Sequence, residues 1–441
     1  MDIKIEKPVQ GGSIKAIASK SEAHRLLISA ALSDGETYIT CREYGEDIDA
    51  TLRCLENITE SISYTDGVFH IKPITLGERC GIKGKEKLLF ECGESGSTLR
   101  FLLPVCGALG LSTTFVMKGR LPQRPLGALS EEMEKHGCSI TFPLKSNKKD
   151  PLLSLDGSSL LLKGKLQSGS YTIPGNISSQ FISGLLFALP LLESESTLEV
   201  TGNLESRPYV DMTMEVINKF GISIMEEQKQ FFRMRGGQIY KSPGKIFAGG
   251  DWSNAAFWLC AGAISGKAIS CTGLDLSSSQ GDKEIINILK RFGVKITANS
   301  DGVTVYPSKL KSINIEVENI PDLVPVIAAI ASLAEGKTII GKAERLRTKE
   351  SNRLASVTKA LSAIGADIRE SEDGLVIQGK EKLRGGMSES FGDHRIAMML
   401  AIASSACSEA ITIKNAEAVD KSYPLFFDDF KNLGGLYTEI N

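Results

Sequence analysis

The sequence has few or none of the features that mark several large classes of protein. It contains only 4 histidines and no H-E-x-x-H motif, which leaves little from which a catalytic metal centre could be built. It has no G-x-x-x-x-G-K-S/T motif, so an enzyme with a nucleotide-binding P-loop is disfavoured. Only 6% of the residues are aromatic, and they form no ladder of the kind that stacks nucleic-acid bases. Metal-centred chemistry, P-loop nucleotide hydrolysis and nucleic-acid binding are therefore poor candidates.

Neither an excess of charge of one sign nor a long apolar run is present. Lys and Arg number 51 against 53 Asp and Glu, a formal net charge of −2, which excludes a general polycation but allows a local basic pocket. No run approaches the roughly 18 apolar residues of a membrane span, and residues 1–8 contain no apolar signal core. We therefore expect no membrane contact and a location in the cytoplasm.

The cysteines do not form a recognisable framework. There are 9 of them, an odd number, and no pair has the C-x-x-C spacing. A zinc knuckle or a disulfide scaffold is therefore disfavoured, and reduced, mostly buried thiols are expected.

What the sequence does contain is a repeat. A chain of 441 residues is too long for one ordinary core. An amphipathic helix that ends at a glycine, followed by an alternating strand, recurs around Gly137, Gly221, Gly293, Gly365 and Gly434. A small apolar helix followed by a break and a short strand recurs at 26–40, 101–117, 181–200, 257–271, 326–340 and 396–413. Each repeat is about 70 to 85 residues long and has the order β-α-β-α-β-β.

These repeats predict an α/β (α+β) fold of two lobes with three repeats each. Lobe one is predicted to span residues 20–235, and lobe two residues 1–19 together with 236–441. The glycine- and proline-containing stretch 235–245 reads as the crossover between them. By pattern alone, the strand at residues 3–7 could belong to either lobe.

Cations stand where the small apolar helices begin. Serine, aspartate and glycine are expected there as helix caps, which is a sufficient explanation for Ser97 or Asp251. Capping does not explain Lys20, Arg25, Arg100 or Arg395, because a cation in the first turn opposes the helix dipole. Such cations make sense if an anion binds in front of the free N–H groups.

Three loops carry further cations, at 119–125, 345–353 and 420–424. Each alone could be a solvated charged loop. Together, in a chain of nearly neutral charge, they predict a focused cationic cleft for a small ligand with several negative charges.

Nine short motifs in order resemble a known family. They are Lys20-Ser21 with Arg25, Gly96 before Arg100, Arg124-Pro125, Ser178-Ser179-Gln180, Ser206 with Pro208-Tyr209, Pro321-Asp322, Lys349-Glu350 with Arg353, Asp393-His394-Arg395, and Lys421 with Pro424. From end to end the chain resembles the EPSP synthase (3-phosphoshikimate 1-carboxyvinyltransferase) family of enolpyruvyl transferases. The resemblance implies an inside-out α/β barrel type of fold, with two lobes of three βαβαββ repeats, the N-terminal strand in lobe two, and the active site in the interlobe cleft.

The resemblance also implies a reaction and a site. The carboxyvinyl group of phosphoenolpyruvate passes to the 5-hydroxyl of 3-phosphoshikimate through a tetrahedral intermediate, and phosphate leaves. The implied 3-phosphoshikimate site comprises Lys20, Ser21, Arg25, Ser178, Ser179, Gln180, Ser206, Asp322 and Lys349. The implied phosphoenolpyruvate site, where the herbicide glyphosate also binds, comprises Lys20, Gly96, Arg124, Gln180, Arg353, Arg395 and Lys421. Asp322 is the implied general base, and Glu350, assisted by Lys20, the implied acid. No metal, nucleotide, flavin or other cofactor is required, and we expect a monomer whose partners are these two substrates.

Some residues depart from the family pattern, and two alternatives remain. Glu94 stands where an asparagine is common, so its carboxylate must point away from the phosphate or pair with a cation such as Lys20. The related UDP-N-acetylglucosamine enolpyruvyl transferases carry Asn where this chain has Ser21, and a reactive cysteine near Arg120, whereas this chain has no cysteine between Lys118 and Met133. The second alternative is a relative that binds anions without catalysis.

Overall fold

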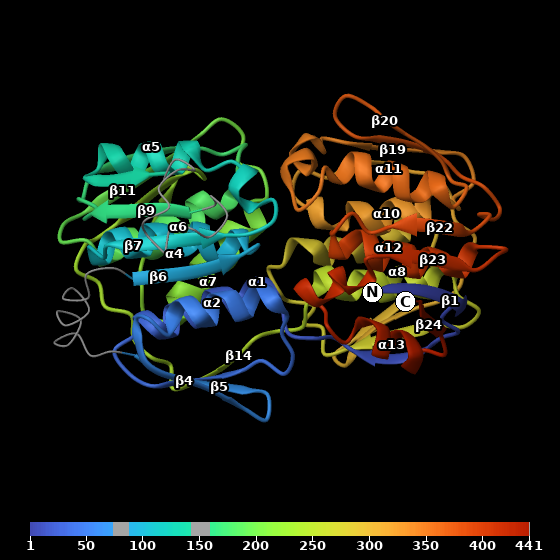
Figure 1. The fold of residues 1–441 in the computed structure, drawn as a ribbon, viewed down its shortest axis with the longest axis horizontal. Helices are drawn as coiled ribbons and strands as arrows, with labels where there is room; N and C mark the ends of the chain where they lie inside the picture. Colours follow the sequence, from blue (N-terminus) through green and yellow to red (C-terminus); the bar gives the residue numbers. More distant parts are fainter. Residues whose placement is uncertain (74–87, 143–158, 441) are drawn as a thin grey trace. The chain divides into compact units, whose positions relative to one another are not determined.

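The computed structural model describes residues 1–73, 88–142 and 159–440, and the chain forms two compact units (Figure 1). We call Lys20–Arg42 with Glu46–Ala248 lobe one, and Met1–Ser19, Glu43–Gly45 and Gly249–Asn441 lobe two. None of the helices in the described residues is both long enough and apolar enough to span a membrane.

The predicted end of lobe one at Arg235 is too early. Strand β14 (Lys245–Phe247) pairs in parallel with β3 (Thr37–Thr40), and Lys245 lies opposite Tyr38. Because this pairing holds the chain in lobe one up to Ala248, the predicted crossover at 235–245 lies within lobe one.

A second difference from the predicted boundaries is that Glu43–Gly45 belong to lobe two. A Cβ on Gly45 would lie 2.6 Å from the carbonyl oxygen of Asp420, so only glycine allows this close approach.

Lobe one contains three four-stranded sheets, with the orders β14-β3-β5-β4, β6-β7-β9-β8 and β10-β11-β13-β12. Its other strands are β4 (Thr59–Thr65), β5 (Val68–Pro73), β6 (Leu88–Gly93), β7 (Thr113–Met117), β8 (Cys138–Thr141), β9 (Ser159–Gly164), β10 (Ser170–Pro174), β11 (Ser196–Thr201), β12 (Met225–Glu227) and β13 (Phe231–Met234). Its helices are α1 (Lys20–Leu32), α2 (Glu46–Leu55), α4 (Gly96–Leu109), α5 (Gly127–Lys135), α6 (Ser179–Ala188) and α7 (Arg207–Lys219), with the 3₁₀ turns η1 (Leu121–Gln123) and η2 (Leu189–Leu191).

Lobe two repeats this arrangement, with the orders β16-β17-β15-β2, β18-β19-β21-β20 and β22-β23-β1-β24. Its strands are β1 (Asp2–Lys7), β2 (Gly12–Lys15), β15 (Ile269–Thr272), β16 (Ile296–Asn299), β17 (Gly302–Val305), β18 (Asn314–Glu316), β19 (Lys337–Gly341), β20 (Asp367–Glu370), β21 (Leu375–Gln378), β22 (Gly386–Glu389), β23 (Ile411–Lys414) and β24 (Leu436–Ile440). Its helices are α8 (Trp252–Ile264), α9 (Ile285–Arg291), α10 (Val324–Ala331), α11 (Arg353–Ala363), α12 (His394–Ala403) and α13 (Phe426–Asn432). The 3₁₀ turns are η3 (Gly281–Glu284), η4 (Pro321–Leu323), η5 (Glu344–Thr348), η6 (Ser404–Ala406) and η7 (Ala416–Lys421).

The sheets share one pattern, and strands distant in the chain complete it. In each sheet one edge pair is parallel and the other two pairings are antiparallel. The N-terminal strand β1 lies between β23 and β24, so both chain termini are in lobe two (Figure 1). The six sheets and the helices between them confirm the predicted mixed α/β fold.

The small apolar helices form the interior of each lobe. In lobe two, α8, α10 and α12 pack on one another, and every residue of α10 and α12 is buried. A helix that is apolar on all sides requires such a position. The strands instead alternate buried and exposed residues, as in β11, because one face of each sheet meets solvent. Because the sides of these helices are buried, a ligand could reach them only at their ends. Predicted site residues lie at such ends, for example Ser179 on α6 and Arg395 on α12.

Candidate active site

Four helices of lobe one begin at predicted substrate-binding residues. Helix α1 begins at Lys20, α4 at Gly96 and α6 at Ser179, while Ser206 immediately precedes α7. Ser178 caps α6, since its Oγ accepts a hydrogen bond of 3.3 Å from the backbone N–H of Gln180. Four helix N-termini therefore carry these residues, and each N-terminus favours anions.

Arg25 holds the starts of α1 and α7 together. Its Nε donates to Thr213 Oγ1 at 2.8 Å, its Nη2 to the carbonyl oxygen of Tyr209 at 2.9 Å, and its Nη1 to the carbonyl oxygen of Ser21 at 2.6 Å. The guanidinium also lies 5.0 Å from the ring centre of Phe101. Burial lowers the pKa of Arg25 to about 10, so the side chain stays charged at neutral pH. Arg25 thus supplies positive charge and fixes the position of Ser21.

Gln180 joins the starts of α4 and α6. Its Nε2 donates to Ser97 Oγ at 2.9 Å, and its Oε1 accepts from Arg100 Nη1 at 2.7 Å. Arg100 Nη2 also donates to the carbonyl oxygen of Pro125 at 2.7 Å. The sequence marks Arg100 as an unusual cation in the first turn of a helix, but the implied substrate-binding sites do not include it. The structure places it between Gln180 and the loop that carries Arg124.

Two guanidinium groups converge on the backbone of Gly96. A Cβ at this position would lie 2.9 Å from Arg124 Nη1 and 3.2 Å from Arg100 Nη1. The helix behind them is capped by Ser95, whose Oγ accepts from the Thr98 N–H at 3.3 Å. A helix N-terminus with two arginine side chains beside it has the groups that suit an anion.

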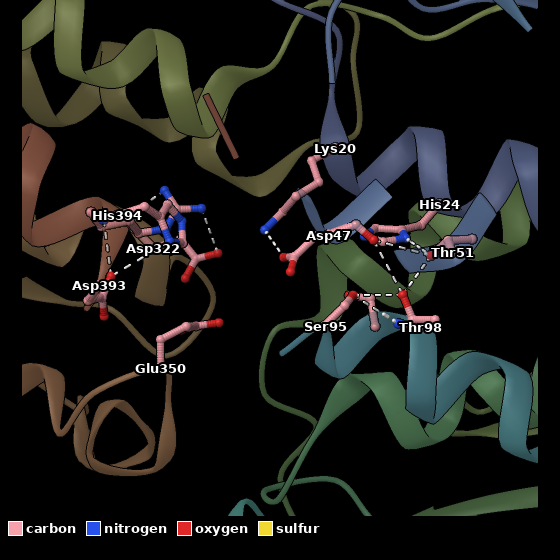
Figure 2. A network of polar contacts seen from close by, with 12 residues as sticks. Lys20, His24, Asp47, Thr51, Ser95, Thr98, Asp322, Glu350, Asp393 and His394 are labelled. Atoms are coloured by element: carbon pink, nitrogen blue, oxygen red, sulfur yellow. Dashed lines mark hydrogen bonds and ion pairs between the residues drawn. The ribbon is translucent and has the colours of Figure 1, made fainter. Parts of the chain in front are cut away.

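Lys20 is paired with a carboxylate that the sequence did not single out (Figure 2). Its Nζ lies 2.7 Å from Asp47 Oδ2. Behind Asp47, the hydroxyl of Thr51 lies 2.6 Å from Thr98 Oγ1 and 2.8 Å from His24 Nδ1. Burial lowers the pKa of His24 to about 3, so this histidine is neutral and its role in the network is structural. No sequence motif marks Asp47, because it lies on a different helix from Lys20.

Glu94 lies beside Gly119. A Cβ on Gly119 would overlap Glu94 Oε1, so the carboxylate lies against the backbone at that glycine. Gly119 has φ of +53°, a conformation that favours glycine as well. Asp47 forms an ion pair with Lys20, and the carboxylate of Glu94 lies beside Gly119.

In lobe two, Asp322 accepts hydrogen bonds from two arginines. Its Oδ1 accepts from Arg353 Nη1 at 2.8 Å and its Oδ2 from Arg395 Nη2 at 3.1 Å. Burial alone would raise the pKa of Asp322, but Arg395, Lys349 and Arg353 hold it well below its usual range. Asp322 is therefore ionised and can accept a proton.

Arg353 binds three carboxylates and is itself 1% exposed. Besides Asp322, it donates from Nη2 to Glu350 Oε2 at 2.7 Å and from Nε to Asp393 Oδ2 at 2.9 Å. Asp393 also caps α12 through the N–H of Arg395 at 3.0 Å. Three carboxylates, Asp322, Glu350 and Asp393, thus surround the guanidinium of Arg353. An incoming anion must share Arg353 with the carboxylates.

Lobe two contains further predicted residues, Lys349 and Lys421, as well as His394 of the Asp393-His394-Arg395 motif. Burial lowers the pKa of Lys349 to about 8. Lys421 ends η7 and is buried, and its carbonyl oxygen would lie 2.7 Å from a Cβ on Gly45. His394 is buried with Nδ1 3.8 Å from Asp393 Oδ1, which is longer than a hydrogen bond. In the described part of the chain, no three His, Cys, Asp or Glu side chains are grouped as metal ligands.

The fold and these two clusters define a class of protein. It is an α/β protein in which arginines, lysines and carboxylates lie at helix starts, an arrangement suited to binding small anions. The model of the family described as EPSP synthase (3-phosphoshikimate 1-carboxyvinyltransferase) matches residues 3–430. The chain belongs to this family, which confirms the assignment made from the nine motifs.

Relatives and solved structures agree with the family match. The chain is 44% identical over 429 residues to the 3-phosphoshikimate 1-carboxyvinyltransferase of Clostridium kluyveri, covering 96% of this chain and 95% of the relative. It is 42% identical to the protein of the same name from Clostridium beijerinckii, covering 100% and 99%. The structure of EPSP synthase from Acinetobacter baumannii superposes with a TM-score of 0.80 at 25% identity, covering all of both chains. These names favour the 3-phosphoshikimate enzymes over the UDP-N-acetylglucosamine alternative.

Proposed function

We propose that the protein transfers the carboxyvinyl group of phosphoenolpyruvate to the 5-hydroxyl of 3-phosphoshikimate and releases inorganic phosphate. The observation that carries this proposal is Asp322, an ionised carboxylate held between Arg353 and Arg395 in a chain that belongs to the family. An ionised carboxylate that is oriented by hydrogen bonds is suited to take a proton from a substrate hydroxyl.

Lobe one is proposed to supply most of the anion-binding groups. Gly96 and Arg124 would hold phosphoenolpyruvate at the start of α4, with Lys20 and Gln180 beside them. Ser21, Arg25, Ser178, Ser179 and Ser206 would bind 3-phosphoshikimate, because they stand at the starts of α1, α6 and α7. Arginine pairs bind phosphate and carboxylate through parallel hydrogen bonds, which fixes the substrate orientation.

Lobe two is proposed to supply the proton-transfer groups. Asp322 accepts the hydroxyl proton as the new C–O bond forms, and Glu350 donates a proton to the methylene carbon, assisted by Lys20. Loss of phosphate from the tetrahedral intermediate, together with return of a proton from its methyl carbon to Glu350, then restores the carbon–carbon double bond. Arg353, Arg395 and Lys421 would hold phosphoenolpyruvate, and Lys349 would hold 3-phosphoshikimate. We propose that both clusters act on the same substrate pair, in the interlobe cleft that the family resemblance implies.

Release of phosphate in the presence of both substrates tests the proposal. Asp322→Asn should lower turnover by about 10²–10⁴-fold, the usual effect of removing an acid–base group. Glu350→Gln should have an effect of similar size while 3-phosphoshikimate still binds. Asp301→Asn, at an exposed hairpin turn of lobe two, is the matched control and should keep full activity. Near-normal turnover in either site variant would remove that residue from the mechanism.

The same assay separates the alternatives. UDP-N-acetylglucosamine offered in place of 3-phosphoshikimate should give no phosphate, and a non-catalytic relative would bind substrates without releasing any phosphate.

We further propose that the enzyme acts as a monomer in the cytoplasm. All eight cysteines of the described residues are free thiols, as is typical of a reducing compartment. Sedimentation of the protein with both substrates tests the monomer.

A further inference from the structure

A chain of buried hydrogen bonds joins three helix starts of lobe one (Figure 2). The hydroxyl of Thr51 on α2 lies 2.6 Å from Thr98 Oγ1 on α4 and 2.8 Å from His24 Nδ1 on α1. Thr98 Oγ1 in turn donates to Ser95 Oγ at 2.7 Å. All four side chains are buried, with exposed fractions of at most 1%. Because bulk water does not reach these groups, each needs a partner within the protein.

At one end, the chain lies behind the ion pair of Lys20. Lys20 Nζ pairs with Asp47 Oδ2 at 2.7 Å, and Thr51 follows Asp47 by four residues on α2. His24 likewise follows Lys20 by four residues on α1. Residues four apart lie on the same face of a helix. The ion pair and the hydrogen bond between His24 and Thr51 therefore join the same faces of α1 and α2 at two successive turns.

At the other end, the chain reaches the start of α4. Ser95 caps α4 by accepting the Thr98 N–H at 3.3 Å, and it accepts the Thr98 hydroxyl as well. Gly96 is the first residue of α4, and its backbone lies close to the guanidinium of Arg124. Because Thr98 also contacts Thr51, hydrogen bonds hold the start of α4 to α2.

The protons of this chain all point toward α4. Thr98 donates its only hydroxyl proton to Ser95, so Thr51 must be the donor at the 2.6 Å contact with Thr98. Thr51 then has no proton left for His24, so the imidazole must donate from Nδ1.

The second nitrogen of His24 agrees with this direction. Burial lowers the pKa of His24 to about 3, so the ring is neutral and carries one N–H. Its Nε2 is buried and has no hydrogen-bond partner among the described residues. A proton on Nε2 would therefore bury an N–H group without an acceptor, which is costly.

We propose that Thr51 and Thr98 are positioning residues that hold Lys20 and Gly96 at the separation that one phosphoenolpyruvate molecule requires. A directed chain is satisfied in full by only one arrangement of the three helix starts. A ligand that contacts both Lys20 and the start of α4 then meets groups that are already in place, so little binding free energy is lost in ordering them. The inference rests on the proposed assignment of Lys20 and Gly96 to phosphoenolpyruvate.

Valine substitutions test the hydroxyls, because valine has nearly the shape of threonine without its hydroxyl. Thr51→Val and Thr98→Val should each raise the KM for phosphoenolpyruvate by roughly three- to tenfold, the effect of one lost hydrogen bond. The KM for 3-phosphoshikimate should rise by a smaller factor, because of the two positioned residues only Lys20 is assigned to that substrate. Thr113→Val is the matched control, since Thr113 is fully buried in the same lobe but lies on β7, outside the chain. It should leave both KM values at those of the parent.

Serine substitutions separate the hydroxyl from packing. Thr51→Ser and Thr98→Ser keep the hydroxyl and lose a methyl group, so the KM for phosphoenolpyruvate should stay close to the parent value. If packing were the cause, the serine variants would bind phosphoenolpyruvate more weakly than the valine variants. Thr51→Val combined with Thr98→Val should raise the KM by less than the product of the two single factors, because both hydroxyls belong to one link.

The direction of the chain has a spectroscopic readout that does not depend on activity. In protein labelled with nitrogen-15 histidine, His24 should carry its proton on Nδ1, with Nε2 unprotonated, from about pH 6 to 8. The chain has 4 histidines, and the His24 signals are those missing from His24→Asn. Thr51→Val removes the acceptor of the Nδ1 proton, so this preference for Nδ1 should be lost.

The outcomes separate this inference from the proposed function. A proton on Nε2 of His24, or valine variants whose KM for phosphoenolpyruvate equals that of Thr113→Val, would show that the chain does not position the site. If thermal melts show that a valine variant is unfolded, the matching serine variant and the tautomer decide instead. If the parent releases no phosphate from the two substrates, the proposed function is wrong and the inference falls with it, while the His24 tautomer still reports the direction of the chain.

Discussion

At the scale of single residues, burial changes the charge of a predicted substrate contact. Lys349 loses hydration beside Asp322, and burial lowers its pKa from 10.5 to about 8. A lysine attracts phosphate only when it is protonated, so the positive charge is present below about pH 8 and lost above it.

We therefore expect the affinity for 3-phosphoshikimate to fall by up to roughly tenfold per pH unit above about pH 8. Calorimetric titration across pH 7 to 10 measures the effect. Lys349→Arg is the control, because a guanidinium keeps its charge throughout this range. An equal decline in parent and variant would assign the titration to another group.

Gly96 has a close neighbour that the sequence could not reveal. The family resemblance attributes its small size to contact with phosphoenolpyruvate, whereas the structure places the Arg124 guanidinium 2.9 Å from an added Cβ. Gly96→Ala must displace Arg124, and we expect the KM for phosphoenolpyruvate to rise by roughly tenfold as a charge-assisted hydrogen bond is weakened.

Gly127→Ala is the matched control, since Gly127 also begins a helix and its Cβ would meet only Glu131 at 3.5 Å. We expect the glyphosate inhibition constant of Gly96→Ala to rise by a larger factor than the KM, because the family resemblance implies a slightly longer ligand at the same place. Paired inhibition measurements with thermal melts check both values. Equal changes in Gly96→Ala and Gly127→Ala would contradict a role for the Arg124 contact.

At the scale of elements, the carboxylate of Asp393 links the start of α12 to Arg353, a residue proposed to bind substrate. Asp393 caps α12 and also binds Arg353 at 2.9 Å. Asparagine is as good a cap as aspartate but carries no charge, so substitution can separate the two roles.

We expect Asp393→Asn to raise the KM for phosphoenolpyruvate, because Arg353 loses the charged acceptor at 2.9 Å that orients its guanidinium. Asp393→Ala should raise it similarly and lower the free energy of unfolding by about 1 kcal/mol more, the usual value of a cap. Urea unfolding and steady-state kinetics of the two variants provide the comparison. Equal stability of both would mean that the cap contributes nothing to α12.

At the scale of the whole molecule, the N-terminal strand completes the last repeat. Ile3 is fully buried and pairs with Ile413 on one side and Glu439 on the other. The first residues of the chain therefore stabilise a sheet made from its last residues.

Ile3→Ala should lower the free energy of unfolding by about 2–5 kcal/mol, since it leaves a cavity inside lobe two. Lys4→Ala, on the exposed face of the same strand, should change it by about 0.5 kcal/mol or less. Equilibrium unfolding measures both, and proteolysis should cut lobe two first in the Ile3 variant. Equal effects would show that β1 is dispensable.

The sequence by itself determined the repeats, the helix starts and the family. A small apolar helix followed by a strand is a local pattern, and α12 with β23 lies where the repeat at 396–413 predicts them. The motif residues could be found because each motif is a short run, as at Ser178 to Gln180.

Only the tertiary structure decided which distant residues meet. The pairings of β1 with β24 and of β14 with β3 join segments far apart in the chain, which moved the end of lobe one from Arg235 to Ala248. Asp47, which pairs with Lys20, carries no motif, and this pairing depends on how the helices α1 and α2 pack. Burial, which lowers the pKa of Lys349, likewise exists only in the folded chain.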